Sequence, residues 1–383
     1  MKRTIYDADH EAFRATIRDF IASEVVPDFP QWEKDRQAPR EFFRKLGELG
    51  VLGFGIPEEY GGAGEASFKY MAVIIEETNR AGVTFGHFNV NTGVVLPYLL
   101  RLANEEQRQR WLPGLASGDL LLAIAMTEPG TGSDLAGIRT SARRDGDHYV
   151  LNGTKTFITG GVNSELVVVV CRTSPPEPGD RRAGLSLLVV EQGTPGFDVG
   201  RKLDKIGQKS LEAVELSFAD VRVPVANLLG EEGKAFGYLS ANLPRERLTI
   251  GVGATAAAQT AIDITTAYVK DRQLFGKHLA DFQNTKFELA ACAAEVEAAW
   301  AMVDRGIELD DSGELGAADA AKIKLFCTET AGRVIDRCLQ LFGGYGYILE
   351  YQIARLYTDI RVQRIFGGTS EVMKTIIAKS LGL

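Results

Sequence analysis

The sequence predicts an α+β fold in which a β domain lies between two helical domains. Residues 9–24 place apolar side chains on one face of a helix. Strand-like apolar runs occupy the middle of the chain, and alanine-rich helical sequence follows them. We therefore expect an N-terminal helical domain over residues 1–118, a middle β domain over 119–228 and a C-terminal helical bundle over 229–383.

The N-terminal part is expected to be helical with one interruption. The segment 57–64 combines a proline with three glycines, which end helices and favour turns. Periodic helical sequence then resumes and continues to about residue 117.

The middle part carries the clearest strand signals. Residues 148–151 and 154–158 flank Asn152-Gly153, a pair that tolerates positive φ, so we expect a tight hairpin turn there. Apolar runs and alternation predict further strands at residues 166–172, 185–191 and 213–218.

The C-terminal part is expected to be helical again. Helical sequence covers residues 254–268, 287–303, 317–341 and 370–381. No long low-complexity linker separates the three parts, so we expect them to pack into one unit.

Bulk properties exclude several classes of protein. With 383 residues and a formal net charge of −8, the chain lacks the basic footprint of a nucleic-acid-binding protein. The first ten residues lack the apolar core of a secretory signal, so we expect a cytoplasmic protein. The longest apolar stretch, residues 248–264, is interrupted by polar residues and predicts a buried helix rather than a membrane span. Four cysteines and four histidines show no metal-ligand spacing, so no metal site is expected.

Two loops have the composition of ligand-binding segments. Residues 125–137 combine glycines with hydroxyls and acids, and residues 340–347 carry three glycines in four positions after a helix. Glycine allows the backbone to approach a ligand closely. Taken alone, the first segment is also typical of a turn between strands, and the second of a helix cap. The chain contains neither a Rossmann glycine turn nor a P-loop, so a nucleotide would have to be held in another way.

Three segments together resemble the acyl-CoA dehydrogenase family. They are Thr127–Asp134, then Arg272-Gln273-Leu274-Phe275-Gly276-Lys277, then Gln340–Gly346 continuing to Glu350, Arg355 and Asp359. With the helix–β–helix order around them, the resemblance covers essentially the whole chain. It implies a β-barrel or sandwich in the middle domain and FAD as the cofactor. It also implies conversion of acyl-CoA thioesters to trans-2-enoyl-CoA, with hydride passing to flavin N5. Electrons would then pass to an electron-transfer flavoprotein, and the assembly would be a homotetramer built as a dimer of dimers.

The resemblance also implies which residues contact FAD. They are Ile124, Met126, Thr127, Gly132, Ser133, Phe157, Thr159, Arg272, Phe275, Gln283, Gln340, Gly343, Gly344, Thr369 and Glu371. Arg272 resembles the arginine that meets the FAD pyrophosphate of a neighbouring subunit, a role that suits its guanidinium fork. Without the resemblance, Arg272 would be a solvated charge at a helix end, and Phe157 a core residue of a strand.

The catalytic base is expected at Glu246. Many members of the family carry a glutamate where this chain has Gly367, which has no side chain to accept a proton. The segment Leu243-Pro244-Arg245-Glu246-Arg247-Leu248 resembles the long-chain and isovaleryl-type branch, in which the base comes from this segment. Burial would raise the pKa of Glu246, whereas the flanking arginines would lower it, so the sequence leaves the net shift open. An exposed Arg-Glu-Arg ion-pair cluster is the alternative.

Substrate contacts are implied at Ser133, Arg247, Gly367 and Gly368, with the N–H of Gly367 donating to the thioester oxygen. A Gly367→Glu, Glu246→Gly double variant is expected to restore part of the turnover. The sequence leaves three other functions open. The acyl group could be bound to a carrier protein instead of CoA, the reduced flavin could react with oxygen, or the chain could be a non-catalytic thioester-binding homologue.

Overall fold

The computed structural model describes residues 2–65 and 67–383. The N-terminal part is helical, with two π-helical segments, η1 and η4. Its elements are α1 (Ala8–Phe20), η1 (Ile21–Val25), α2 (Phe29–Asp35), α3 (Arg40–Glu48), α4 (Phe68–Ala81), η4 (Asn89–Val95), α5 (Leu96–Leu102) and α6 (Glu105–Ser117). Polar caps fix where α1, α4 and α6 begin. The Asn104 side chain accepts from the backbone of Gln107 at the start of α6, and the Gln107 side chain accepts from the backbone of Asn104 in return.

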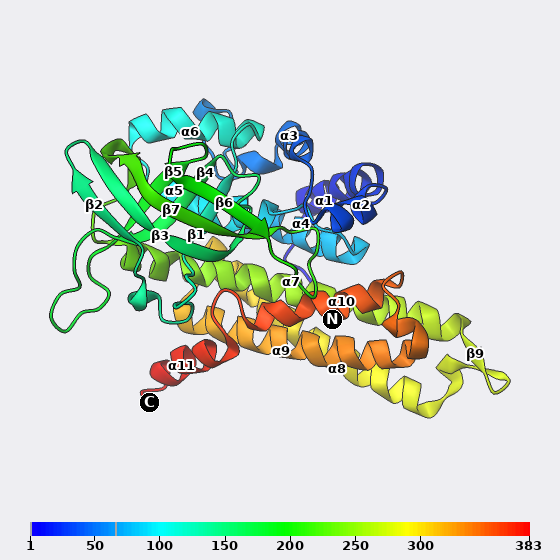
Figure 1. Ribbon diagram of the computed structural model, residues 1–383. Helices are drawn as coiled ribbons and strands as arrows, with labels where there is room; N and C mark the ends of the chain where they lie inside the picture. Colours follow the sequence, from blue (N-terminus) through cyan, green and yellow to red (C-terminus); the bar gives the residue numbers. More distant parts are fainter. Residues whose placement is uncertain (1, 66) are drawn as a thin grey trace.

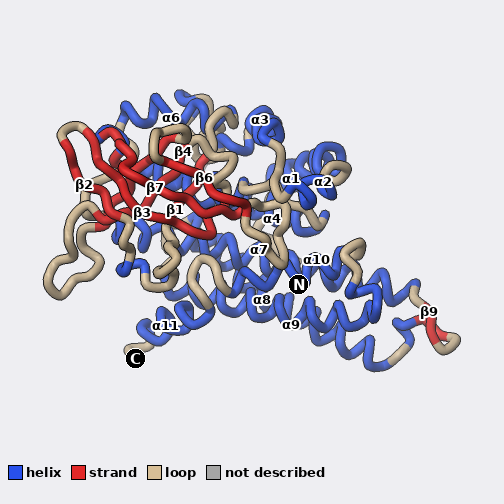
Figure 2. Tube along the Cα trace, in the orientation of Figure 1, coloured by secondary structure: helices blue, strands red, loops and turns tan. Residues whose placement is uncertain are grey.

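One mixed sheet forms the middle of the chain. Its strands are β1 (Leu122–Ala125), β2 (Ser141–Asp145), β3 (His148–Thr159), β4 (Leu166–Arg172), β5 (Leu185–Glu191), β6 (Phe197–Lys202), β7 (Ala213–Pro224) and β8 (Leu228–Leu229). They run in the order β6-β7-β3-β2-β4-β5-β8, and β1 pairs with β4 in parallel. The strands at 166–172 and 185–191 match the prediction, and the predicted α+β fold is confirmed (Figure 2).

The hairpin turn predicted at Asn152-Gly153 is wrong. Residues 148–159 form one strand, β3, and Gly153 lies at an irregularity in its pairing with β7. The turn lies earlier, because Asp145 of β2 pairs with His148 of β3 and Gly146 adopts a φ of 64° between them. Gly146 and Asp147 are the two loop residues, and glycine at the first of them is typical of a type II′ hairpin turn. The strand before it was missed because its side chains are mostly charged and exposed.

The C-terminal part is a bundle of long helices with a small hairpin at one end. It contains α7 (Ala235–Asp271), β9 (Gln273–Leu274), β10 (Lys277–His278), α8 (Gln283–Asp311), α9 (Ala317–Phe342), α10 (Gln352–Ile360) and α11 (Ser370–Ser380). Short 3₁₀ turns connect the elements of the chain, at Val51–Gly53, Glu58–Tyr60, Leu135–Gly137, Val225–Asn227, Leu279–Asp281, Gly343–Tyr347 and Arg361–Arg364. The predicted helix at 254–268 is the second half of α7, which begins well before it and contains Pro244.

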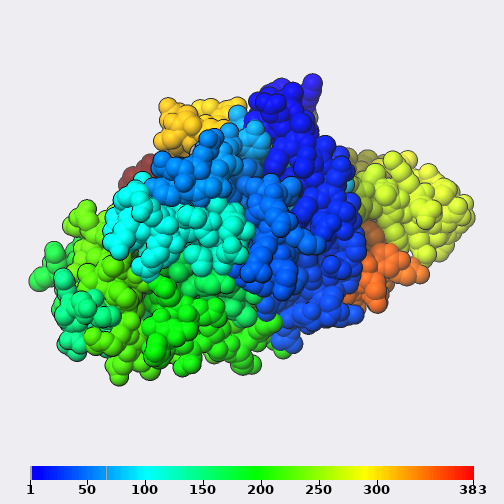
Figure 3. Space-filling view, turned by 90° about the horizontal axis from the view of Figure 1, so that it is seen from above, coloured from blue at the N-terminus to red at the C-terminus, as the bar shows by residue number. Residues whose placement is uncertain are grey.

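Helix α7 connects the three parts of the molecule. It runs beneath the sheet and packs against α8 and α9 of the bundle, α4 of the N-terminal part and β5 (Figure 1). Viewed from above, the N-terminal residues lie across the middle of the molecule, with the β domain on one side and the end of the bundle projecting on the other (Figure 3). One apolar cluster joins α1–α4 to the bundle, a second joins α5 and α6 to the sheet, and a third fills the sheet's other face. Among the described residues, no helix is long and apolar enough to span a membrane.

Candidate active site

Glu246 is a buried carboxylate on α7, with a side chain held by two donors. It is 5% exposed, and both the Tyr98 hydroxyl and the Asn242 side-chain amide donate to its Oε1, each over 3.1 Å. Burial raises the pKa of Glu246, and this outweighs the opposing effects of the two hydrogen bonds and the Arg247 charge. The structure therefore answers the question that the sequence left open, and it does not support an exposed Arg-Glu-Arg cluster.

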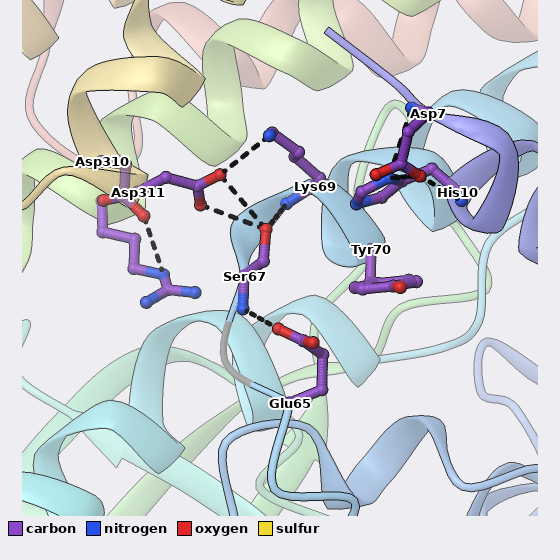
Figure 4. A pocket seen from close by; sticks show the side chains of 9 residues that line it. Asp7, His10, Glu65, Ser67, Lys69, Tyr70, Asp310 and Asp311 are labelled. Carbon is purple, nitrogen blue, oxygen red and sulfur yellow. Dashed lines mark hydrogen bonds and ion pairs between the residues drawn. The ribbon is translucent and has the colours of Figure 1, made fainter.

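The arginine that precedes the carboxylate points elsewhere. Arg245 pairs with Asp310 of α8 over 3.7 Å, in the wall of a cavity of about 560 Å³ between α1, α4, α7 and α8 (Figure 4). The other lining residues are mostly charged and bond to one another, as where the Ser67 hydroxyl and the Lys69 ammonium both meet Asp311. The mostly charged lining of this polar hollow does not suit an acyl chain, and none of the predicted site residues lines it.

The glycine loop before α11 lies against the segment of α7 that carries Glu246. Gly367 and Gly368 adopt φ values of 65° and 95°, which glycine reaches without strain. The Arg247 side chain donates to the carbonyl of Gly367 over 3.4 Å, and the Lys324 ammonium donates to the carbonyl of Gly368 over 2.6 Å. Two buried cations therefore hold the two carbonyls of this loop, which fixes the peptide planes that carry the N–H groups of Gly368 and Thr369 and restrains the glycine loop as a whole.

Lys324 is the residue here that the sequence analysis missed. It lies on α9, is 1% exposed, and burial together with the Arg247 charge lowers its pKa to about 8. Its one sequence signal is a lysine among the buried apolar positions of an alanine-rich helix, where a charge needs a specific partner.

A side chain at position 367 would meet α7 directly. A Cβ added to Gly367 lies 2.5 Å from Cδ1 of Ile250, which is one turn after Glu246 and on the same face of the helix. A side chain at position 367 and the side chain of Glu246 would therefore point toward the same region. A glutamate at 367 would also have to adopt a φ of 65°, so the double variant predicted from the sequence requires Ile250 to move and the backbone to tolerate strain.

The segment after β1 is fixed by an ion pair that the sequence analysis did not identify. Lys155 is 1% exposed, and its ammonium donates to the carbonyl of Met126 over 2.9 Å and to Glu128 over 3.0 Å. Glu128 also accepts two backbone N–H groups, and the N–H of Thr156 donates to the carbonyl of Thr127. Met126 and Thr127, both predicted FAD contacts, are thus fixed against β3.

Phe157 of β3 has the geometry of a ligand contact rather than of a core residue. It is 68% exposed and adopts a φ of 60°, at a bulge in the pairing of β3 with β7. Left-handed backbone is strained for a bulky side chain and often marks a functional site. Thr159 follows two residues later at the strand end, and Ile124 is the third residue of β1, a strand that contacts β3, and is 9% exposed. An exposed aromatic face beside polar side chains fits the flat ring system of a flavin.

The other predicted FAD contacts form a second group at the far end of the bundle. Figure 1 places the β9 hairpin, which carries Phe275, at the opposite end of the molecule from β1 and β3. Phe275 is 90% exposed with a φ of 52°, and the Arg272 guanidinium lies 5.5 Å from the centre of the Tyr345 ring. Cβ atoms added to Gly343 or Gly344 would enter open space. Gln283 begins α8 and Gln340 lies near the end of α9.

One chain therefore does not bring the two groups of predicted FAD residues together. The first group, on the β domain, also includes the exposed loop residues Gly132 and Ser133. Thr369 and Glu371 follow the glycine loop, where the Thr369 hydroxyl accepts from Val372 and caps α11. Separation within a chain is the arrangement expected if each cofactor is shared between two subunits.

Comparison with known proteins identifies the chain. Family models for the N-terminal, middle and C-terminal domains of acyl-CoA dehydrogenases match residues 7–119, 123–221 and 233–382. The chain belongs to the acyl-CoA dehydrogenase family. It is 42% identical to the pig long-chain specific acyl-CoA dehydrogenase, over 99% of this chain and 88% of that one. It superimposes on a crystal structure of an acyl-CoA dehydrogenase from Geobacillus kaustophilus with a TM-score of 0.96 and 46% identity, covering 99% of both chains.

Membership of the family establishes the class of reaction. Acyl-CoA dehydrogenases are FAD-dependent oxidoreductases that act on CH–CH groups of acyl-CoA thioesters, and this chain is one of them. A glutaryl-CoA dehydrogenase from Mycobacterium smegmatis, solved in complex with FADH2, superimposes with a TM-score of 0.90 and 30% identity over 98% of this chain and 95% of that one. The exposed, strained Phe157 and the open glycines at 343 and 344 are consistent with such a cofactor.

Proposed function

We propose that this enzyme dehydrogenates long-chain or branched acyl-CoA thioesters and that Glu246 removes the α proton. The observation that carries the proposal is a buried, oriented carboxylate on the face of α7 that meets the Gly367 loop. The 42% identity to a long-chain specific relative supports the substrate class. No side chain at position 367 competes for the role of base.

Burial gives Glu246 the properties of a base for a weakly acidic C–H group. A carboxylate without water around it has a raised pKa, which increases its affinity for a proton. A base positioned in this way contributes about 10²–10⁴-fold in rate. After it has accepted the proton, Glu246 is an uncharged carboxylic acid, and burying an uncharged acid costs little free energy.

The Gly367 loop supplies the complementary electrostatic stabilisation. Loss of the α proton places negative charge on the thioester oxygen, where we propose that the N–H of Gly367 donates. A preorganised donor of this kind contributes several kcal/mol. The nearby Arg247 and Lys324 charges favour the same anion. Ser133 and Gly368 complete the proposed substrate contacts.

The proposed cofactor site joins two subunits. Ile124, Met126, Thr127, Ser133, Phe157 and Thr159 would hold the flavin ring, which when bound supplies the acceptor for the hydrogen that leaves the β carbon as hydride. Arg272, Phe275, Gln283, Gln340, Gly343 and Gly344 would contact the FAD of a neighbouring subunit. A homotetramer built as a dimer of dimers, with an electron-transfer flavoprotein as electron acceptor, completes the proposal.

The test is a Glu246→Gln variant, with exposed Glu314→Gln as the matched control. We expect both proteins to bind FAD and remain yellow. Anaerobic addition of octanoyl-, palmitoyl- or isovaleryl-CoA should bleach the flavin of the wild type and of the control, but not that of Glu246→Gln. Normal bleaching of the Glu246→Gln flavin would remove Glu246 from its proposed role.

The same experiment separates the alternatives. A wild-type flavin that no thioester bleaches would indicate a non-catalytic homologue. Bleaching by acyl groups on a carrier protein, but not by the matched CoA thioesters, would indicate a tethered substrate. The relative rates along the CoA series identify the preferred chain length and branching.

A further inference from the structure

The carboxylate of Glu246 receives both of its described hydrogen bonds on one oxygen. Tyr98, from α5, and Asn242, one turn earlier on α7, each donate to Oε1 over 3.1 Å. A glutamate side chain has three rotatable bonds and samples several rotamers unless its neighbours hold it. Two donors from two helices restrict that freedom and leave Oε2 out of both contacts.

Tyr98 is a donor that cannot easily lose its proton. Its side chain is 0% exposed, and burial together with the negative charge of Glu246 raises its pKa far above the ordinary value. The phenol therefore stays neutral throughout the working range of an enzyme. The distance of 3.1 Å makes this a long hydrogen bond of the O–H to carboxylate type, which orients the carboxylate and favours its ionised form.

Asn242 is oriented by a second acceptor. Its side-chain nitrogen donates to Glu246 and also to the backbone carbonyl of Val94, over 3.0 Å, in the π-helical segment η4. Both neighbours accept, so only the –NH₂ side of the amide can face them. Asn242 thereby links the carboxylate to the N-terminal part of the chain.

We infer that Tyr98 and Asn242 are positioning residues for the base, holding the Glu246 carboxylate in one orientation and keeping it ionised for proton removal. The inference rests on the proposed role of Glu246. The charged groups described on the elements around it bond to other partners, including Arg101 of α5, which donates to the carbonyl of Tyr238. Arg247 and Lys324 bond to the carbonyls of Gly367 and Gly368, and Arg245 pairs with Asp310 of α8. The two neutral donors are therefore the groups that touch the carboxylate.

The experiment measures the base without the oxidation step. A 3-thiaacyl-CoA has sulfur in place of the β carbon, so its α proton can exchange with solvent deuterium while no hydride can leave. The exchange rate of 3-thiaoctanoyl-CoA is followed by mass spectrometry from pH 5 to 9 with the FAD-loaded wild type and with the Tyr98→Phe and Asn242→Leu variants. Tyr60→Phe is the matched control, because the Tyr60 hydroxyl donates to Glu105 of α6 and not to Glu246.

We expect the acid limb of the exchange profile to move to higher pH by about one unit in each variant, because each has lost a donor that favours the ionised carboxylate. Tyr60→Phe should keep the wild-type limb. FAD absorbance and the unfolding midpoint establish that each variant is folded, and Asn242→Leu carries the test if Tyr98→Phe does not fold.

Two outcomes overturn the inference. The limb could stay at the wild-type position in the folded variants, or exchange could fall equally at every pH, as a merely structural contact would give. A Glu246→Gln sample distinguishes these from failure of the proposed function. If the α proton still exchanges in Glu246→Gln, Glu246 is not the base. If exchange is lost in Glu246→Gln but the acid limb of the profile stays in place in Tyr98→Phe and Asn242→Leu, only the positioning role is rejected.

Discussion

Replacing Lys324 by methionine should separate stability from activity. The ammonium is buried and donates to the carbonyl of Gly368 over 2.6 Å. Its pKa falls from 10.5 to about 8, so keeping it charged at pH 7 costs about 3 kcal/mol. Its hydrogen bond as a charged donor returns about 1.5–3 kcal/mol. Lys324→Met removes both the cost of burying the charge and the gain from its hydrogen bond. We therefore expect the free energy of unfolding at pH 7 to change by less than about 2 kcal/mol.

The rate of flavin reduction should respond much more strongly. Without the ammonium, the carbonyl of Gly368 loses its anchor, and the loop that carries the N–H of Gly367 is held less firmly. Loss of one preorganised donor typically slows a reaction about 10²–10³-fold, and because Arg247 still holds part of the loop we expect roughly 10–100-fold. The assay is stopped-flow bleaching by an acyl-CoA, together with denaturant unfolding.

The matched control is Lys322→Met, two residues earlier on the same helix. Lys322 is exposed and pairs with Asp319 at the surface, so its loss should change neither the rate nor the stability appreciably. The pH dependence gives a further check. Below pH 8 the buried Lys324 is charged and lowers the free energy of unfolding by the full cost of its burial. As pH rises from 8 toward 10.5 this cost disappears, so the free energy of unfolding of the wild type should increase over that range and that of Lys324→Met should not. If the flavin of Lys324→Met is bleached at the wild-type rate, Lys324 does not hold the loop in its active conformation.

Three further perturbations test other parts of the structure. Glu212 is buried with its pKa raised to about 7, so wild-type stability falls as pH rises from 4.5 through 7. Glu212→Gln should therefore be more stable by up to about 3 kcal/mol in urea unfolding at pH 8 and equal at pH 4. Lys155→Met leaves the Glu128 charge buried and should cost about 3–5 kcal/mol with loss of FAD absorbance, whereas adding Glu128→Gln should recover most of the stability. Gly367→Ala forces a φ of 65° and a contact with Ile250, so it should lose about 1–2 kcal/mol and bleach more slowly, and an unchanged melting temperature would contradict this.

Sequence patterns predicted the fold well where one element carries its own signal. The strands at 166–172 and 185–191 are continuous apolar runs, and the helices of the bundle have regular apolar spacing, so local patterns sufficed. The hairpin prediction failed because Asn152-Gly153 and Gly146-Asp147 are both good turn signals, and only the pairing of β2 with β3 decides between them. That pairing is a long-range property of the sheet.

The candidate site shows a similar division. Resemblance supplied Glu246 and Gly367, but the residues that hold them lie on other elements, Tyr98 on α5 and Lys324 on α9. Nothing in a one-dimensional pattern places a tyrosine against a glutamate 148 positions away. The direction of the Glu246 pKa shift was equally inaccessible, because it depends on Arg245 pairing with Asp310 and on the depth of burial.

The π-helical turn of η4 sets the rotational phase of the helix that follows it. A π turn contains more residues than an α turn, so each such insertion rotates everything downstream about the helix axis. If residues 89–95 adopted α-helical geometry with no residue removed, α5 would turn by about 100° relative to the preceding chain. Tyr98 and the carbonyl of Val94 would then face away from α7, and the carboxylate would lose both of its links to the N-terminal part. The hydrogen-bonding pattern of one helical turn far from Gly367 would thus decide whether the base is aligned.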